Sequence, residues 1–252
     1  MDKFIIEGGN RLCGAAQTQS AKNSVLVLLA ASILTEEQVT IENVPHISDV
    51  LHMSEILQKL GADVCFADGN VTISSGNAAE RDLSSHLTRE LRSSVFMLGS
   101  VLTRFKHARI SYPGGCDIGL RPIDLHLFGL KKLGVKTEER DGYIVCNAEK
   151  LVGANIHLDF PSVGATENIL LASVKAQGET VITNAAKEPE IRDLQDFLNQ
   201  MGAGVRGAGT DTIVVRGVQR LHGTRFTPIR DRIEAGTFLI ACAMCGGEVC
   251  VE

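Results

Sequence analysis

Residues 21–44, AKNSVLVLLAASILTEEQVTIENV, decide the fold, because their pattern of an apolar helix followed by a short strand returns three more times. The later copies begin near Arg92, Thr166 and Arg232. The centres of the four strands are spaced by 69, 72 and 69 residues, at Ile41, Ile110, Ile182 and Val251. Spacing this regular indicates an internal structural repeat.

The first three copies continue in the same way. Each has a second, amphipathic helix that stops at a glycine, which is the common C-terminal signal of a helix. The stops are Gly61, Gly134 and Gly202. Two alternating strands then close each unit, and they are residues 62–66 with 70–74, 135–139 with 143–147, and 203–207 with 212–216. One such unit cannot bury its apolar face, so we expect an α/β fold in which three units surround an axis or stack in a row.

The fourth copy stops at Glu252, in the middle of its strand. A strand without its partners is an exposed edge. We therefore expect a fragment, a truncated gene product, or a chain that is completed by a partner, with self-association through the incomplete unit as one outcome.

Composition excludes several classes of function. The net charge of -5 and the aromatic content of 4% argue against nucleic-acid binding. The longest apolar run, residues 24–34, is shorter than the ~20 residues that span a bilayer. The first residues carry charges where a signal peptide needs an apolar run. We expect a cytoplasmic protein without a membrane anchor.

The seven cysteines are scattered and odd in number, which favours free thiols in a reducing compartment. Cys242 and Cys245 have a CxxC spacing, but neither a second pair nor a nearby histidine completes a zinc site. We expect no metal and no cofactor. The basic run RFKHAR, residues 104–109, is interpreted as a solvated turn.

Residues 112–126, YPGGCDIGLRPIDLH, place Cys116 and Arg121 in a glycine-rich loop. Glycines let backbone amides approach an anion, and arginine supplies a permanent cation. Pro122 precedes apolar residues at helical spacing, so Arg121 and Pro122 are predicted to start a helix. A site that combines an anion pocket with a reactive thiol and a plain turn with a packed cysteine both remain possible here.

Basic residues also stand at the starts of the leading helices. Lys22 with Asn23 opens the first helix, Arg92 opens the second, and Asn168 lies near the start of the third. Around an axis these positions would converge, and with Arg121 they would form a cationic pocket for phosphate and carboxylate groups. The alternative for Lys22 is a solvated surface side chain.

Six segments together resemble one family, the MurA-type enolpyruvyl transferases, or UDP-N-acetylglucosamine 1-carboxyvinyltransferases. They are AKNS at 21–24, LRSS at 91–94, PGGCDIGLRPIDLH at 113–126, SVGAT at 162–166, NAAKEPEI at 184–191 and RDRIEAGTF at 230–238. The resemblance implies an inside-out α/β barrel of repeated βαβαββ-like units in two domains. Residues 20–229 would form the first domain, and residues 1–19 with 230–252 would belong to a mostly absent second domain.

The resemblance also implies a reaction, in which the enolpyruvyl group of phosphoenolpyruvate moves to the 3'-hydroxyl of UDP-N-acetylglucosamine and phosphate is released. This is the first committed step of bacterial peptidoglycan synthesis. Cys116 would be the general acid, and Lys22 and Arg121 would act beside it. The implied substrate-binding residues are Lys22, Asn23, Arg92, Arg121, Pro122, Ile123, Asp124, Leu125, Ser162, Val163 and Gly164.

Three features depart from the family pattern. Ser20 replaces a usual glycine, and Phe160 stands where some members have a lysine that touches the nucleotide. The family's base for the sugar hydroxyl and a further arginine belong to the part not present in these residues. A nucleotide-sugar-binding remnant without turnover is therefore the alternative to an active transferase.

Overall fold

The protein, in this computed structural model, is described over residues 3–81, 92–111 and 122–252, and the predicted repeat is confirmed. The leading helices are α1 (Lys22–Ala31), α4 (Met97–Phe105), α6 (Val163–Ser173) and α8 (Arg232–Cys245). A 3-10 turn, η1 (Ser32–Leu34), follows α1, and another, η2 (Arg92–Phe96), precedes α4. Each leading helix runs into one strand, namely β2 (Val39–Ile41), β5 (His107–Ser111), β9 (Glu179–Thr183) or β13 (Gly247–Val251).

The second helices and the closing strands also form as predicted. The helices are α2 (Ser48–Lys59), α5 (Asp124–Lys132) and α7 (Pro189–Gln200). The strands are β3 (Asp63–Ala67), β4 (Asn70–Ser74), β6 (Lys136–Arg140), β7 (Tyr143–Asn147), β10 (Gly204–Arg206) and β11 (Thr212–Arg216). Gly61, Gly134 and Gly202 take φ angles of +96°, +95° and +96°, so the three stops are the left-handed turns that favour glycine.

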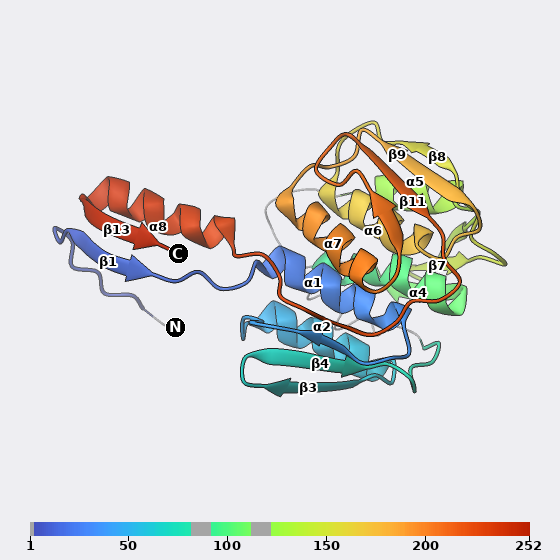
Figure 1. The fold of residues 1–252 in the computed structure, drawn as a ribbon, viewed down its shortest axis with the longest axis horizontal. Coiled ribbons are helices and arrows are strands. Elements are labelled where there is room, and N and C mark those ends of the chain that lie inside the picture. The colour runs from blue at the N-terminus through green and yellow to red at the C-terminus, as the bar shows by residue number, and fades with distance from the viewer. Residues whose placement is uncertain (1–2, 82–91, 112–121) are drawn as a thin grey trace.

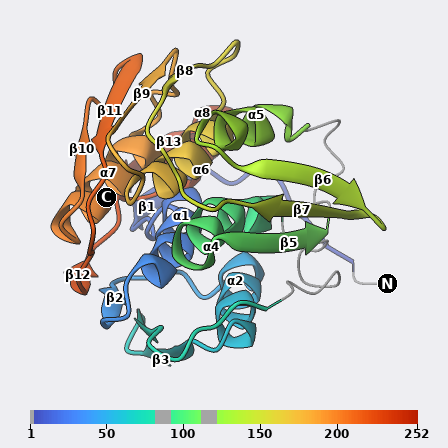
Figure 2. The same cartoon turned by 90° about the vertical axis from the view of Figure 1, so that its right-hand side faces the viewer.

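Two short parallel strands decide how the units are arranged. β8 (Asn155–His157) follows the second unit in the chain but pairs with β9 of the third. β12 (Thr224–Phe226) follows the third unit and pairs with β2 of the first. Because the third unit returns a strand to the first, the units close around an axis, and Figure 2 shows their three sheets surrounding a central group of helices.

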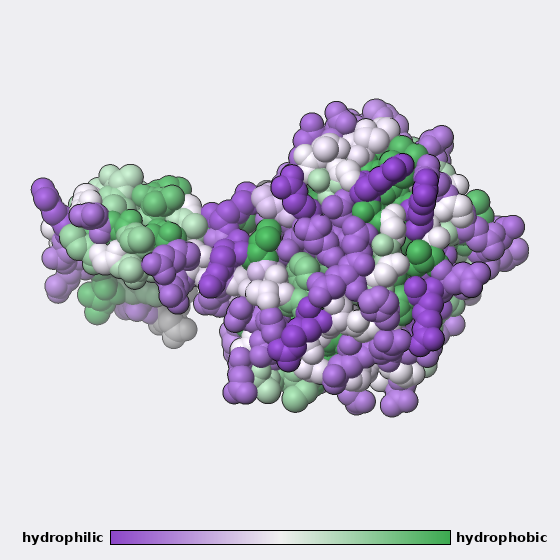
Figure 3. All heavy atoms as spheres, viewed as in Figure 1, coloured by the Kyte–Doolittle hydropathy of each residue, from purple (hydrophilic) through white to green (hydrophobic). Residues whose placement is uncertain are grey.

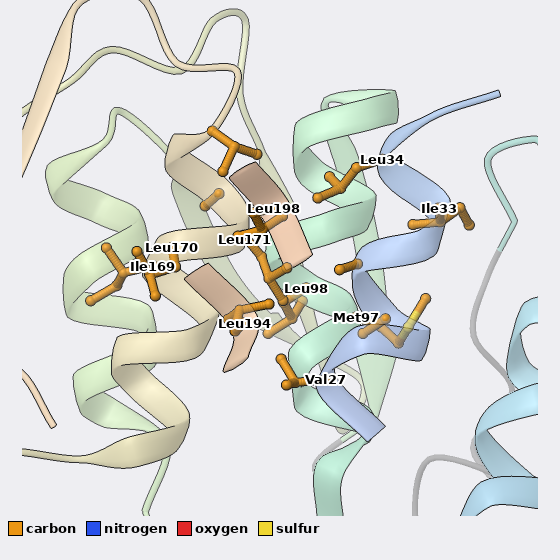
Figure 4. Packing of buried hydrophobic residues seen from close by; sticks show 14 of the residues in the cluster. Val27, Ile33, Leu34, Met97, Leu98, Ile169, Leu170, Leu171, Leu194 and Leu198 are labelled. Carbon is orange, nitrogen blue, oxygen red and sulfur yellow. The ribbon is translucent and has the colours of Figure 1, made fainter. Parts of the chain in front are cut away.

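The core lies along this axis. Every residue of 24–31 in α1, 97–103 in α4 and 165–173 in α6 is buried. Figure 4 shows Leu98 of α4, Leu171 of α6 and Leu194 of α7 pointing into the same space. Fully burying such a side chain contributes about 1.5–3 kcal/mol, so the mostly apolar sequences of α1, α4 and α6 suit their position along the axis.

The interpretation of residues 104–109 as a solvated turn is wrong, because α4 ends at Phe105 and β5 begins at His107, which leaves Lys106 as the single residue between them. The Arg104 side chain is only 10% exposed, and its guanidinium donates hydrogen bonds to three backbone carbonyls. Nη1 lies 2.8 Å from the oxygen of Ile33 and 3.0 Å from that of Thr35, and Nη2 lies 2.7 Å from that of Ser75. Arg104 therefore supplies hydrogen-bond donors to the backbone carbonyls at the end of η1. The spacing of residues in the sequence could not reveal these contacts.

β1 (Leu12–Ala16), α8 and β13 form a small lobe beside the rounded body (Figure 1). β1 and β13 pair in parallel. Two antiparallel segments connect the lobe to the body, where the Ala21 amide donates to the oxygen of Ile229 at 2.8 Å. No helix in the described part of the chain is long and apolar enough to cross a membrane.

Candidate functional site

The first turns of α5 and α6 meet, although the residues concerned are almost forty positions apart. His126 of α5 is 5% exposed and lies against Gly164 of α6. A Cβ added at Gly164 would stand 3.0 Å from Cε1 of the His126 ring. The segments 122–125 and 162–164, both predicted to contact a nucleotide, therefore flank one buried imidazole.

The start of α6 is built as an anion-binding helix terminus would be. Ser162 is its N-cap, and the Ser162 hydroxyl accepts from the Ala165 amide at 3.3 Å. Thr166 Oγ1 donates to the Ser162 carbonyl and accepts from the Ala186 amide. Ser162, Val163 and Gly164 remain partly exposed. Amide groups at such a terminus, together with the helix dipole, favour phosphate.

The predicted start of α5 needs a correction. The helix begins at Asp124, with Ile123 as its N-cap, so Pro122 precedes the helix instead of lying in its first turn. Ile123 is buried and anchors this entry to the core, whereas Pro122 and Asp124 are exposed and Leu125 is half-buried. The exposed residues are thus available to a ligand beside α6.

Lys22 is the first residue of α1 and already has carboxylate partners. Its Nζ lies 2.9 Å from Oδ2 of Asp49 on α2, and its backbone amide donates to Oδ2 of Asp231 at 3.1 Å. Asn23 is exposed. An anionic ligand at this point would compete with Asp49 for the Lys22 ammonium.

Three predicted site groups lie outside what the structure describes. Cys116 and Arg121 are outside the described residues, and so is the side chain of Arg92, although Arg92 itself begins η2. η2 packs against both α1 and α6. The start of the second leading helix therefore does adjoin the other two, as the repeat predicted.

Sequence reasoning missed a buried carboxyl on α6. Glu167 is 1% exposed, and its Oε2 has no hydrogen-bond partner among the residues that the structure describes. Burial raises the pKa of Glu167 well above its ordinary value, and the charges of Glu190 and Glu188 raise it further. Glu190 in turn pairs with Arg232 at 3.2 Å. The only signal in the sequence is an acidic residue inside an apolar helix.

A second carboxyl is buried where α7 meets α1. Burial is the main cause that raises the pKa of Asp193, while a hydrogen bond from the Ser24 hydroxyl opposes the shift. The Ile229 amide donates to the same carboxylate at 3.2 Å. Asp193 thus ties α1 to the segment that leads into the lobe.

Among the described residues, no cluster of histidine, cysteine and carboxylate side chains could hold a metal ion. Cys242 and Cys245 both lie on α8, and neither forms a disulfide with another cysteine in the described part of the chain. Cys146 is buried, which raises the pKa of its thiol to about 12. A thiol with so high a pKa is almost entirely protonated near neutral pH and is a poor nucleophile.

Similarity to known proteins extends over nearly the whole chain. A family model described as EPSP synthase (3-phosphoshikimate 1-carboxyvinyltransferase) matches residues 6–252. The chain belongs to this family. Within the family, it is 54% identical over 251 residues to UDP-N-acetylglucosamine 1-carboxyvinyltransferase 2 of Caldanaerobacter subterraneus subsp. tengcongensis, and covers 60% of that protein. It is 51% identical over 246 residues to UDP-N-acetylglucosamine 1-carboxyvinyltransferase 1 of Clostridium acetobutylicum, and covers 59% of it.

Solved structures support the same fold for this EPSP synthase family member. The enolpyruvyl transferase NikO from Streptomyces tendae matches with a TM-score of 0.83 at 28% identity, over 94% of this chain and 56% of that one. EPSP synthase from Acinetobacter baumannii matches with a TM-score of 0.75 at 22% identity, over 98% of this chain and 56% of that one. The predicted resemblance and the enolpyruvyl-transferase fold are confirmed, and the chain spans about 60% of the length of the curated relatives it matches.

Proposed function

We propose that this chain carries the nucleotide-sugar part of a UDP-N-acetylglucosamine 1-carboxyvinyltransferase site. The observation that supports this most is the identity of 54% to a protein of that name along the whole chain. We further propose that residues 20–229 act as one domain, and that residues 1–19 and 230–252 belong to a second. The pairing of β1 with β13, and the position of their lobe beside the body, support this division.

In the proposed reaction the 3'-hydroxyl oxygen of UDP-N-acetylglucosamine bonds to C2 of phosphoenolpyruvate, and Cys116 gives a proton to the methylene carbon. The hydroxyl proton leaves to a base. The C2–O bond to phosphate then breaks and inorganic phosphate departs. A methyl proton passes to a base, which restores the double bond, and the Cys116 thiolate regains a proton from water. Atoms balance, because the sugar oxygen replaces the phosphate oxygen on C2. A thiol suits the acid role, since proximity to cations can tune its pKa toward the working pH.

We assign the uridine diphosphate to the junction of α5 and α6. Pro122, Asp124 and Leu125 would contact the nucleotide from the start of α5, and Ser162, Val163 and Gly164 would contact it from the start of α6. Their exposure and the helix terminus at Ser162 support this placement. Lys22, Asn23, Arg92 and Arg121 would bind the anionic groups of phosphoenolpyruvate, with Lys22 leaving Asp49 to do so.

Phosphate release by the 252-residue protein, with both substrates present, tests the transferase proposal. If the 252-residue protein turns over both substrates, release should be lost in Cys116→Ser and retained in Cys65→Ser, because Cys65 is an exposed thiol on β3 away from α5 and α6. Equal release by Cys116→Ser and the unmodified protein would contradict the role of Cys116.

The second candidate function is binding of UDP-N-acetylglucosamine without turnover. Calorimetric titration with UDP-N-acetylglucosamine separates the two. Binding with no phosphate release would favour the non-catalytic function. Neither binding nor release would contradict both functions.

As a transferase of this kind, the protein would serve peptidoglycan synthesis from the cytoplasm, where both proposed substrates are present. Fractionation of the source cells and depletion of the gene test this placement. Loss of cell-wall precursor after depletion is the expected result. Unchanged precursor levels would contradict it.

A further inference from the structure

Asn168 joins three neighbouring elements through one buried side chain. It lies on α6 and is 0% exposed. Its Oδ1 accepts from the Gly99 amide of α4 at 2.6 Å, and its Nδ2 donates to the Val95 carbonyl of η2 at 3.0 Å. Nδ2 also lies 3.1 Å from Nδ1 of His126 on α5. Asn168 therefore connects α6 to η2, α4 and α5 at once.

These contacts determine the direction of each hydrogen bond. A backbone amide can only donate, so the Asn168 atom that faces Gly99 must be the oxygen, and the other must be the amide nitrogen. Its two protons then point to the Val95 carbonyl and to His126. Nδ1 of His126 must therefore accept, which assigns a neutral imidazole with its proton on Nε2.

The opposite side of the imidazole is held by backbone. A Cβ at Gly164 would stand 3.0 Å from Cε1 and 3.2 Å from Nε2 of His126, closer than side chains normally approach. A side chain at this position would therefore require the ring or the first turn of α6 to shift by a few tenths of an ångström. The ring is therefore fixed between Asn168 and Gly164 and acts as a spacer between α5 and α6.

We propose that Asn168 and His126 are positioning residues, which set the distance between residues 122–125 and residues 162–164 by holding the His126 ring in one tautomer. This inference rests on the proposed nucleotide site. A nucleotide that bridges the two segments requires a fixed separation, and groups held in place beforehand lose less free energy on binding. Neither residue needs to touch the ligand for this role.

Nitrogen-15 NMR of the histidine side chains tests the hydrogen-bond assignment without any ligand. The chain has seven histidines, and comparison with His126→Asn identifies the signal of His126. We expect a protonated Nε2 and an unprotonated Nδ1. In Asn168→Asp the carboxylate can only accept, so Nδ1 of His126 should become protonated. A protonated Nδ1 in the unmodified protein would overturn the proposal.

Titration with UDP-N-acetylglucosamine tests the positioning role. We expect Asn168→Asp and His126→Asn each to weaken binding about tenfold, which corresponds to ~1.4 kcal/mol. Asn199→Asp is the matched control, because Asn199 on α7 makes its hydrogen bonds to Val205 instead, and its affinity should not change. Circular dichroism of each variant checks folding, and His126→Asn keeps the test available if Asn168→Asp does not fold.

The outcomes separate this inference from the function on which it rests. Unchanged affinity in a folded Asn168→Asp protein with a switched tautomer would overturn the positioning role alone. Absence of binding by the unmodified protein would overturn the proposed site and the positioning role together, and would leave the tautomer as a property of the fold.

Discussion

The leading helices of the body and the leading helix of the lobe have the same place in the repeat and opposite surroundings. In α1, α4 and α6 nearly every residue is buried, whereas α8 has no buried residue. Ile240 and Met244 of α8 are 63% and 82% exposed. Figure 3 shows the resulting apolar surface on the lobe beside a largely hydrophilic body. An apolar sequence shows that a helix has side chains to bury. Whether they are buried depends on the elements that pack against the helix.

The physical cause is the number of partners. In the body, where β8 and β12 close the units around the axis, α4 packs against α6 and α1, α6 also packs against α5 and α7, and α1 packs against α2 and α7. In the lobe, the described elements that pack against α8 are β1 and β13. Apolar area that stays in water contributes nothing to stability.

Truncating one leucine in each setting should produce the largest difference. Leu28→Ala in α1 removes a side chain that is 0% exposed, and we expect a loss of about 2–5 kcal/mol in the free energy of unfolding. Leu239→Ala in α8, where the leucine is 55% exposed, should change it by less than about 0.5 kcal/mol. Urea denaturation of both variants measures this, and equal losses would contradict the contrast.

Adding one methyl group should sharpen the comparison. A Cβ at Gly99 of α4 would lie 2.4 Å from Oδ1 and 2.5 Å from the backbone oxygen of Asn168, so Gly99→Ala should cost about 1–3 kcal/mol. Gly236 of α8 has nothing within 4 Å of the same position, so Gly236→Ala should stabilise its helix by about 0.5–1 kcal/mol. Thermal unfolding curves should therefore shift in opposite directions.

The buried carboxyl of Glu167 should make stability depend on pH. Its pKa in the folded state lies above the ordinary value of 4.5, so above that pH the folded protein holds a proton that the unfolded chain has lost. Stability should fall as pH rises from about 4.5 toward the folded-state pKa, by at most about 1.4 kcal/mol per pH unit. Glu167→Gln should flatten this fall in urea denaturation across pH. Glu248→Gln, at an exposed residue of β13, should leave it intact.

Removing helix caps should give the smallest effect and show where each helix is anchored. Asp231 caps α8, with Oδ1 accepting from the Ile233 and Glu234 amides at 2.8 and 3.1 Å. Asp231→Ala should cost about 1 kcal/mol and speed amide hydrogen exchange throughout the first turns of α8. Ser162→Ala should reduce the free energy of unfolding by a similar amount. In α6, however, burial should keep amide hydrogen exchange slow beyond the first turn. Fast exchange along all of α6 would contradict this difference.

The helix stops, strand pairs and repeat spacing could be predicted because each depends on residues close in the sequence. Gly134 stops α5 through its own φ angle, and the Asp141–Gly142 turn, with φ angles of +54° and +76°, joins neighbouring strands. The start of α5 was placed two residues too early, because the anchor is Ile123, whose burial depends on the core.

The candidate site was predictable only in part. The segments around Asp124 and Ser162 carry recognisable motifs, and the structure brings them together at His126. The roles of Arg104 and Glu167 were not foreseen. Arg104 depends on backbone carbonyls of the first unit, and Glu167 depends on burial in the core and on Glu190 and Glu188, about twenty residues further along the chain. Lys22 was expected to meet an anion, and the ion pair with Asp49 of α2 could not be seen from α1 alone.

The sequence by itself determined the repeated units, their helix ends and the family to which the chain belongs. Periodicity and turn geometry depend on residues that are close together in the sequence. Only the tertiary structure decided that the units close around an axis, that Arg104 is buried, and that Asn168 fixes the imidazole of His126. The reason is physical: burial and hydrogen-bond partners are properties of surroundings, and the surroundings of a residue exist only after distant segments have packed.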